Sequence, residues 1–291
     1  MSNGPELSLP AAYNIADLRE QVRQWRSDGL RIGFVPTMGA LHDGHLALVK
    51  QALETSDRVI VSIFVNPTQF GLGEDLEKYP RDWERDLQLC RERKVDYVFA
   101  PHAEEIYLAD ASTYVSEEGV SSGLCGQARP THFKGVTTIC AKLFNLCRPT
   151  CLALGQKDAQ QVVVLKRMIR DLHFPIEVVI GPTIREADGL AMSSRNAYLN
   201  EKQRADALLL HRALEAGRRL VDEKGVRSVD RVKAEVMNVL RTGSFIRVNY
   251  AEVVDRETMN LESEIELGRS MLVVAVWIDT IRLIDNMPLD E

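Results

Sequence analysis

The chain has 291 residues and a formal net charge of −6, with 45% hydrophobic and 27% charged residues. This composition is typical of a soluble globular protein and excludes the disordered and membrane classes, while the length suffices for one large domain or two ordinary ones. The acidic balance argues against nucleic acid as a partner, so an anionic ligand has to be bound by local cations or helix N-termini.

The first 182 residues contain apolar, β-branched runs that alternate with helical patterns. Apolar positions recur at three and four residues between the runs, as in amphipathic helices. Buried strands that alternate with helices indicate a parallel sheet covered on both faces, so we expect residues 1–182 to form a doubly wound, Rossmann-like α/β domain. The predicted strands are 31–35, 58–65, 95–100, 151–155 and 176–180, and the helical patterns are 46–53, 81–93, 135–147 and 160–172.

The pattern changes after a Gly-, Ser- and Asp-containing segment, 181–200, which is the expected linker or hinge. Helices followed by strands with short turns indicate a smaller α+β domain with an antiparallel sheet, so we expect residues 183–291 to form a C-terminal lid domain. The predicted elements are helices at 201–223 and 229–241 and strands at 245–254, 270–278 and 280–286.

The cysteines are five in number and include no C-x-x-C pair. They lie mostly inside apolar segments, so we interpret them as reduced thiols of a cytoplasmic protein. The N-terminus lacks a basic region followed by an apolar stretch, and no unbroken apolar window is long enough for a bilayer, so we expect neither secretion nor a membrane partner.

Polar segments follow three predicted strands, and in an open parallel sheet they fall on the edge where ligands bind. They are PTMGALHDGH, NPTQFG and QKDAQQ. In the first, Gly39 and Gly44 have the spacing that opens a P-loop, but His45 and Leu46 follow instead of lysine and a hydroxyl residue. Such a loop suits backbone contact with a phosphate and attack at the α-phosphate better than γ-phosphoryl transfer.

Besides contact with a phosphate, the histidines of this loop, His42 and His45, could have either of two other roles. A metal site is disfavoured because Asp43 is the only adjacent carboxylate and no cysteine is near. A structural role is open to either histidine, since a loop histidine often caps a backbone group. Two of the chain's six histidines in one glycine-flanked loop favour a functional role.

In QKDAQQ, Asp158 and Gln161 have the spacing of a capping box, which leaves Lys157 unexplained. A cation at a helix N-terminus opposes the helix dipole unless an anion binds there, so Lys157 is the best candidate for a phosphate contact. In MSSRN, the two serines and Arg195 form a polar loop at the domain junction, which makes a mobile phosphate clamp conceivable. On spacing alone Gln69 is solvent-facing, and Arg129, His132 and Lys134 are a cationic rim or a capped helix start.

Together these residues resemble the pantoate–β-alanine ligase family of the cytidylyltransferase-like superfamily. The resemblance spans nearly the whole chain, HDGH corresponds to the superfamily's HIGH motif, and MSSRN corresponds to its KMSKS loop. The segments that carry it are PTMGALHDGHLALV, SIFVNPTQF, EDLEKYPRD, RPTHFKGV, KLFNLCRP, GQKDAQQ, READGLAMSSRN and RLIDN.

The resemblance implies that pantoate and ATP form pantoyl adenylate, which β-alanine then converts to pantothenate with release of AMP. ATP would be accompanied by Mg²⁺, no metal would be held by the protein alone, and the chain would form a homodimer. The implied catalytic residues are His42, His45, Lys157 and Arg195, and Gln69 and Gln161 would bind pantoate, against the solvent-facing interpretation of Gln69. The implied ATP-binding residues are Met38, Gly39, Ala40, Leu41, His42, Asp43, Gly44, His45, Gly155, Gln156, Lys157, Asp158, Ile184, Met192, Ser193, Ser194 and Arg195.

Three residues depart from the family's commonest pattern, namely Thr68, Gln156 and Ala159. None of them removes a group with an assigned chemical role, so they put pantoate affinity in doubt more than activity. The alternatives are another HIGH-motif nucleotidyltransferase, for which a phosphorylated substrate would require extra cations, and a catalytically silent nucleotide-binding protein. A tRNA-charging enzyme is disfavoured by the acidic balance and by the lack of an anticodon-binding extension.

Overall fold

The computed structural model describes residues 9–289, and these residues divide into two compact units. Two segments from the first 182 residues belong to the same unit as the C-terminal part of the chain. The division into domains 1–182 and 183–291 remains a prediction from the sequence. The first unit consists of 9–116, 134–154 and 169–181, and the second of 117–133, 155–168 and 182–289.

The first unit contains a six-stranded sheet with the order β1-β4-β3-β2-β5-β6. Strand β2 pairs in parallel with β3 and with β5, and β4 pairs in parallel with β3 and with β1. The chain proceeds outward from β2 through β3 to β4 and then returns to place β5 on the other side of β2. This reversal of strand order is where open α/β sheets bind ligands. The strands are β1 (Ala11–Ala12), β2 (Ile32–Thr37), β3 (Arg58–Ile63), β4 (Tyr97–Phe99), β5 (Cys151–Gly155) and β6 (Glu177–Gly181).

Helices cover both faces of this sheet, which confirms the predicted doubly wound class. Side chains of α2 and α3 pack in one buried cluster with Val35 of β2 and Val98 of β4. Because successive residues of a strand face opposite sides, the ring contact of Phe34 with Phe144 places α6 on the other face. The helices are α1 (Ile15–Ser27), α2 (Asp43–Thr55), α3 (Trp83–Glu92), α4 (Ala103–Ile106) and α6 (His132–Cys147).

Helix α1 was not predicted from the sequence, although it carries ordinary start signals. The side chain of Asn14 accepts a hydrogen bond from the backbone N–H of Asp17 and caps the helix. The buried residues Leu18, Val22 and Trp25 recur at four and three positions, as the core face of an amphipathic helix requires. Both signals stand in the sequence and could have identified the helix.

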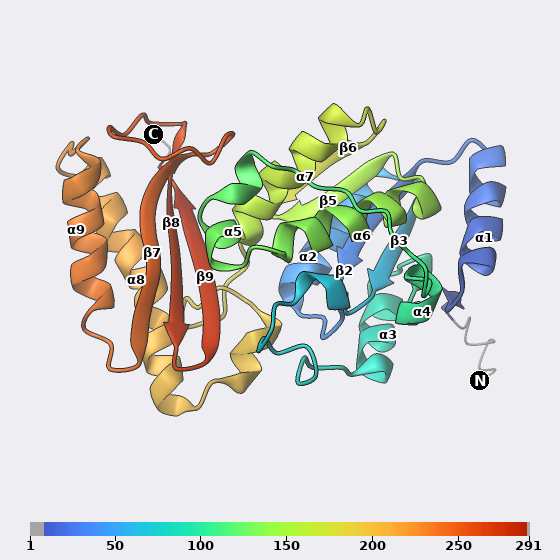
Figure 1. The fold of residues 1–291 in the computed structure, drawn as a ribbon, viewed down its shortest axis with the longest axis horizontal. Helices are drawn as coiled ribbons and strands as arrows, with labels where there is room; N and C mark the ends of the chain where they lie inside the picture. Colours follow the sequence, from blue (N-terminus) through green and yellow to red (C-terminus); the bar gives the residue numbers. More distant parts are fainter. Residues whose placement is uncertain (1–8, 290–291) are drawn as a thin grey trace, which may run out of the picture. The chain divides into compact units, whose positions relative to one another are not determined.

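The second unit contains an antiparallel sheet of three strands, β7 (Ile246–Asp255), β8 (Ser270–Ile278) and β9 (Ile281–Pro288). Helices α8 (Glu201–Asp222) and α9 (Val229–Leu240) pack on the same side of these strands, as Figure 1 shows. Their apolar faces share one buried cluster with the strands, so this sheet has its own core. The predicted C-terminal α+β arrangement is confirmed.

Further helical elements lie in the second unit, apart from the last residues of the longest of them, which belong to the first unit. They are η2 (Val120–Ser122), α5 (Cys125–Ala128), η3 (Gln156–Asp158), α7 (Ala159–Asp171) and η4 (Ser194–Tyr198).

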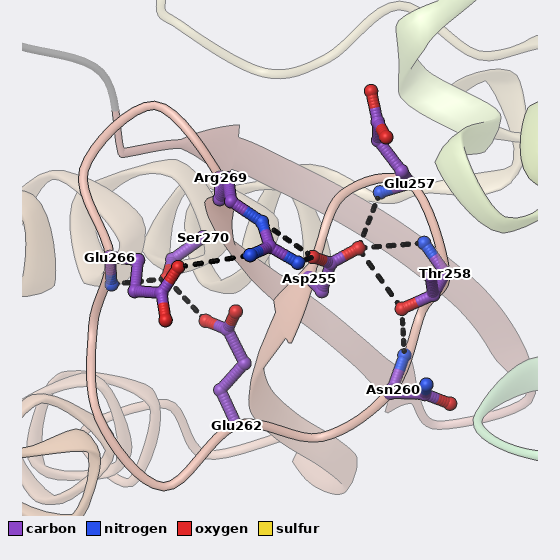
Figure 2. Close-up of polar contacts among 8 residues, drawn as sticks. All are labelled: Asp255, Glu257, Thr258, Asn260, Glu262, Glu266, Arg269 and Ser270. Carbon is purple, nitrogen blue, oxygen red and sulfur yellow. Dashed lines mark hydrogen bonds and ion pairs between the residues drawn. The ribbon is translucent and has the colours of Figure 1, made fainter.

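A buried carboxylate, Asp255, closes the connection from β7 to β8 (Figure 2). One of its oxygens accepts hydrogen bonds from the backbone N–H groups of Glu257 and Thr258 at 2.9 and 2.8 Å. The other accepts from the guanidinium of Arg269 at 2.6 Å. Burial alone would raise the pKa of Asp255, but the Arg269 contact and the backbone donors outweigh it and lower that pKa.

All five cysteines are free and buried, as their apolar surroundings in the sequence led us to expect. Burial raises the pKa of the Cys90 and Cys140 thiols to about 12, so both are protonated at neutral pH. Within residues 9–289, no helix combines the length and the apolar character needed to cross a membrane.

Candidate functional site

The loop after β2 has a backbone shaped for close approach to a ligand. Gly39 and Ala40 both adopt left-handed conformations, with φ of 82° and 50°. A side chain at Gly39 would also lie 3.0 Å from Asp86 and Ile63, so glycine is needed there for both backbone and space. The hydroxyl of Thr37 accepts from the N–H of Gly39 at 3.2 Å and thereby stabilises the start of the loop.

This loop is held from behind by Asp86, a residue of α3 that sequence reasoning did not identify. Its carboxylate, only 1% exposed, accepts from the backbone N–H groups of Ala40 and Leu41 at 2.8 and 2.7 Å. The neighbouring Arg85 donates to the Leu41 carbonyl at 3.2 Å. Burial raises the pKa of Asp86 even though the two backbone donors and Arg85 oppose that shift.

The two histidines of HDGH lie together at the N-terminus of α2. Their rings stack with centroids 4.0 Å apart and an angle of 29° between the planes. His42 is the N-cap residue of α2, and its backbone N–H donates to Nδ1 of His45 at 3.4 Å. When Nδ1 accepts, the proton of a neutral imidazole is on Nε2. The capping role foreseen as the structural alternative is therefore present, and the contact at Nδ1 is consistent with a neutral His45 that carries its proton on Nε2.

The NPTQF segment forms a short helix, η1 (Pro67–Gln69), capped by Asn66. Gln69 is 9% exposed, so its solvent-facing interpretation from spacing is wrong. Its Oε1 accepts from Nδ2 of Asn66 at 3.1 Å, and its Nε2 lies 2.9 Å from the sulfur of Met38. The structure thus joins Met38 and Gln69, two of the predicted ligand-binding residues.

Asn66, in the same segment, is a further buried polar residue. It is 1% exposed and also donates to the carbonyl of Gly135 at 3.1 Å. Its Oδ1 accepts from the hydroxyls of Tyr107 and Thr68 at 2.8 and 3.0 Å. The hydroxyl of Thr68 therefore stabilises Asn66 and through it Gln69.

In the second unit, GQKD forms the helix η3, which leads directly into α7. Gly155 is the N-cap residue, so the predicted capping box of Asp158 with Gln161 is wrong: the helical turn begins earlier, at Gln156, and includes Asp158. The ammonium of Lys157 lies 3.8 Å from the carboxylate of Asp158, and its side chain is 21% exposed. Gln161 lies half-buried in the first turn of α7.

The MSSRN loop enters the helix η4, whose N-cap is Ser193. The Ser193 hydroxyl accepts from the N–H of Arg195 at 3.3 Å. Just before the loop, the carbonyl of Ile184 accepts from the N–H of Met192 at 2.9 Å, which pairs two predicted nucleotide contacts. Asn196 follows, and its amide donates to Glu186 at 2.6 Å.

These two sets of residues have complementary chemistry. The first unit provides a histidine pair at a helix N-terminus, a favourable place for a phosphate or carboxylate. The second provides the cations Lys157 and Arg195 on short helical turns. Such groups suit a reaction in which negative charge develops on phosphate oxygens.

Comparison with known proteins gives a match over nearly the whole chain. The model of the family described as "Pantoate-beta-alanine ligase" matches residues 11–288. The pantothenate synthetase of Moorella thermoacetica is 50% identical over 276 residues, which is 95% of this chain and 97% of the relative. That of Fervidobacterium nodosum is 48% identical over 273 residues, 94% of this chain and 96% of the relative.

Solved structures show the same likeness in three dimensions. A pantothenate synthetase from Thermus thermophilus superposes with a TM-score of 0.92 at 43% identity, covering 97% of this chain and all of that one. A pantoate-beta-alanine ligase from Francisella tularensis, solved with Beta-gamma ATP and β-alanine, gives a TM-score of 0.80 at 30% identity. It covers 96% of this chain and 97% of that chain.

Proposed function

This chain belongs to the pantoate-beta-alanine ligase family, and we propose on that premise that it condenses pantoate with β-alanine in an ATP-dependent reaction. The products are pantothenate, AMP and pyrophosphate. The observation that carries the proposal is the loop from Met38 to His45, in which a left-handed backbone and a histidine pair meet at a helix N-terminus.

In the first step, an oxygen of the pantoate carboxylate attacks the α-phosphorus of ATP. The bond from that phosphorus to the oxygen bridging to the β-phosphorus breaks, and pyrophosphate leaves. His45 donates through Nε2 to an α-phosphate oxygen as its negative charge grows, and His42 contacts the phosphates beside it. The hydrogen bond at Nδ1 of His45 supports this assignment because it favours the tautomer with the proton on Nε2.

The amide of Gln69 binds pantoate together with that of Gln161. An amide pair suits a small hydroxy acid because it supplies both donors and acceptors without adding charge. The burial of Gln69 and its hydrogen bond with Asn66 support a fixed side chain in this role. A phosphorylated substrate would call for additional cations instead.

Lys157 and Arg195 contact the phosphates and stabilise the leaving pyrophosphate, and Asp158 binds the ribose. The ammonium of Lys157 lies 3.8 Å from the carboxylate of Asp158, which makes Asp158 a weak internal partner. The remaining nucleotide contacts are Met38, Gly39, Ala40, Leu41, Asp43, Gly44, Gly155, Gln156, Ile184, Met192, Ser193 and Ser194.

In the second step, the amine of β-alanine attacks the acyl carbon of pantoyl adenylate. The bond from that carbon to the phosphate oxygen breaks, AMP leaves, and the amine loses a proton as the amide forms. The enzyme orients the two reactants in this step, and the new negative charge falls on the phosphate of the leaving AMP, with no pyrophosphate to stabilise.

ATP enters as its Mg²⁺ complex. Mg²⁺ usually retains water and is bound through substrate phosphates with few protein carboxylates. Among residues 9–289, no group of three or more His, Cys, Asp or Glu side chains could hold a metal ion. The family resemblance further supports a homodimer, and the five buried free thiols support a cytoplasmic location.

Product analysis tests the function. Incubation with ATP, pantoate and β-alanine should give AMP and pyrophosphate in amounts equal to the pantothenate formed, and ATP–pyrophosphate exchange should require pantoate. Formation of ADP and phosphate, or exchange that is indifferent to pantoate, would refute the proposal. Transfer of a nucleotidyl group to a phosphorylated acceptor would instead indicate another nucleotidyltransferase of the superfamily.

A further inference from the structure

The RLIDN segment of β9 has no role in the chemistry described so far, although it ends in two buried polar residues. Asp285 is 3% exposed and Asn286 is 5% exposed. A buried carboxylate and a buried amide are unfavourable unless their hydrogen bonds are made within the protein. The partners of these two side chains therefore show what the strand holds.

Asn286 binds the backbone of η3. Its Nδ2 donates to the carbonyl oxygens of Gln156 and Lys157 at 3.0 and 2.9 Å. Its Oδ1 accepts from Nε2 of Gln156 at 3.0 Å. Both amide protons and one acceptor site are thus used on a single turn. The peptide groups on either side of the Lys157 α-carbon are fixed by the strand, and so is the direction in which that side chain leaves the backbone.

Asp285 binds the segment that leads into the MSSRN loop. Its two oxygens accept from the two terminal nitrogens of Arg185 at 2.7 and 3.1 Å, a bidentate pair. Arg185 forms a backbone bridge with Ala191, and its guanidinium also donates to the carbonyl of Gly189 at 3.2 Å. Asp285 therefore stabilises the narrow hairpin from which Met192 and the loop emerge.

The two side chains act on opposite faces of one strand, because successive strand residues point to opposite sides. Leu283 and Met287, which share the face of Asp285, belong to the core cluster with α8 and α9. Ile284, which shares the face of Asn286, packs instead against a cluster that includes Cys125. One rigid dipeptide thus connects two segments that are far apart in the sequence.

We propose that Asp285 and Asn286 are positioning residues for adenylate formation, which set the backbones that carry Lys157 and the MSSRN loop. This inference rests on the proposed function of those two segments. Lysine and arginine side chains are flexible, so their effect on a transition state depends on how well the backbone beneath them is fixed. A displacement of about 1 Å can reduce a rate about 100-fold.

Two variants test the proposal. Asn286→Asp keeps the shape of the side chain but turns an oxygen toward the two carbonyls that Nδ2 now binds. Asp285→Asn keeps one acceptor for Arg185 and loses the charge. Each should lower kcat/KM for ATP in pantoate-dependent ATP–pyrophosphate exchange by about 10–100-fold. Consumption of preformed pantoyl adenylate by β-alanine should change less than about threefold, because the pyrophosphate that Lys157 and Arg195 stabilise is not released in that step.

Asp255→Asn is the matched control, since it also removes a buried carboxylate that pairs with an arginine, Arg269, in the same sheet (Figure 2). It should lower Tm but leave both half-reactions within about twofold of wild type, as expected for a contact that supports only the fold. Each variant is assayed well below its own Tm. Equal losses in both half-reactions, or the same pattern in Asp255→Asn, would show that Asp285 and Asn286 are merely structural.

A double-mutant cycle asks whether Asn286 acts through Lys157. In a Lys157→Ala background, Asn286→Asp should reduce exchange by less than about twofold, because the side chain that it positions is already gone. If Asn286→Asp reduced exchange by the same factor in the Lys157→Ala background as in the wild type, the inference would be overturned. Wild-type enzyme without pantoate-dependent exchange would refute the proposed function itself, whereas active wild type with equally active Asp285 and Asn286 variants would refute only the positioning role.

Discussion

Replacing Asp86 with asparagine keeps the shape of the side chain but removes its charge and one of its two acceptor oxygens. In the wild type each oxygen accepts from one backbone N–H, that of Ala40 or that of Leu41. In the variant the amide nitrogen faces one of these N–H groups. The loop after β2 then loses one restraint at the point where Ala40 holds a left-handed conformation, which is unfavourable by about 1–2 kcal/mol for a residue other than glycine.

Two effects of opposite sign determine the size of the change. A hydrogen bond to a charged group contributes about 1.5–3 kcal/mol, and a buried N–H left without a partner costs about 1–3 kcal/mol. Against this, the neutral amide avoids the desolvation that raises the pKa of Asp86. We therefore expect the free energy of unfolding to fall by only about 1–2 kcal/mol. In the variant, the loop has to be ordered when ATP binds. If this costs about 1.4 kcal/mol, KM for ATP rises about 10-fold.

Urea unfolding and the ATP dependence of pyrophosphate exchange measure the two effects separately. Asp96→Asn is the matched control, because the carboxylate of Asp96 also accepts from a backbone N–H, that of Val59, at 2.8 Å. Val59 lies near the amino end of β3, whereas the loop follows the carboxyl end of β2. The two therefore lie at opposite ends of neighbouring parallel strands. The control should lose stability and keep its KM for ATP. Equal KM values in the two variants would refute the clamping role of Asp86.

The pKa of Asp86 adds a test by pH. Since burial raises the pKa of the folded-state carboxyl, between the unfolded value of 3.8 and the higher folded value the folded protein holds a proton that the unfolded chain has released. Stability contributed by this group therefore falls as pH rises through that window. Below the folded pKa, one oxygen is protonated and no longer accepts, so KM for ATP should increase on acidification in the wild type. The increase in KM should be absent in Asp86→Asn. If this variant showed the same pH dependence of KM as the wild type, Asp86 would be excluded as the source of the increase.

His45→Ala should reduce pantoate-dependent exchange at least about 100-fold with little change in Tm, as loss of a group that donates to the transition state predicts; near-normal exchange would show that this histidine only caps α2. Lys157→Ala should reduce exchange by about 100-fold but affect the use of preformed adenylate much less, and equal losses in both would exclude a phosphate role. Gly135→Ala would place a methyl group 2.6 Å from the backbone of Gln69. It should destabilise the fold by about 1–3 kcal/mol and raise KM for pantoate, whereas Gly123→Ala, which meets nothing within 4 Å, should do neither.

The fold was predictable where apolar periodicity is strong. The continuous apolar runs gave β2, β3 and β5, and the change of pattern after 200 gave the second sheet with its two helices. Helix α1 was missed because polar and charged residues outnumber the apolar ones in it, although its cap and its three buried residues were visible. Spacing failed for Gln69, since a polar residue after a turn is usually solvated and only the tertiary environment buries it.

The residues that support the site could not be found from spacing. Asp86 is 46 positions from Ala40, and Asn286 is 130 positions from Gln156. Carboxylates and amides of this kind are common on protein surfaces, and nothing in the local sequence of either residue indicates burial. Only the topology of the sheet, which brings distant segments together, turns them into hydrogen-bond partners.

Both units use the same physical means to fix a segment that we propose to face the nucleotide. In the proposed function, groups such as His45 and Lys157 have to remain accessible to a nucleotide, so packing around their side chains cannot hold them. The backbone beneath them is accessible from the other side, and there a buried carboxylate or amide binds it, Asp86 in one unit and Asn286 in the other. In a region of low dielectric such hydrogen bonds are strong, but the group that makes them loses its hydration. The raised pKa of Asp86 reflects that loss. A variant at either residue should therefore impair the ATP-dependent step with His45 and Lys157 still present.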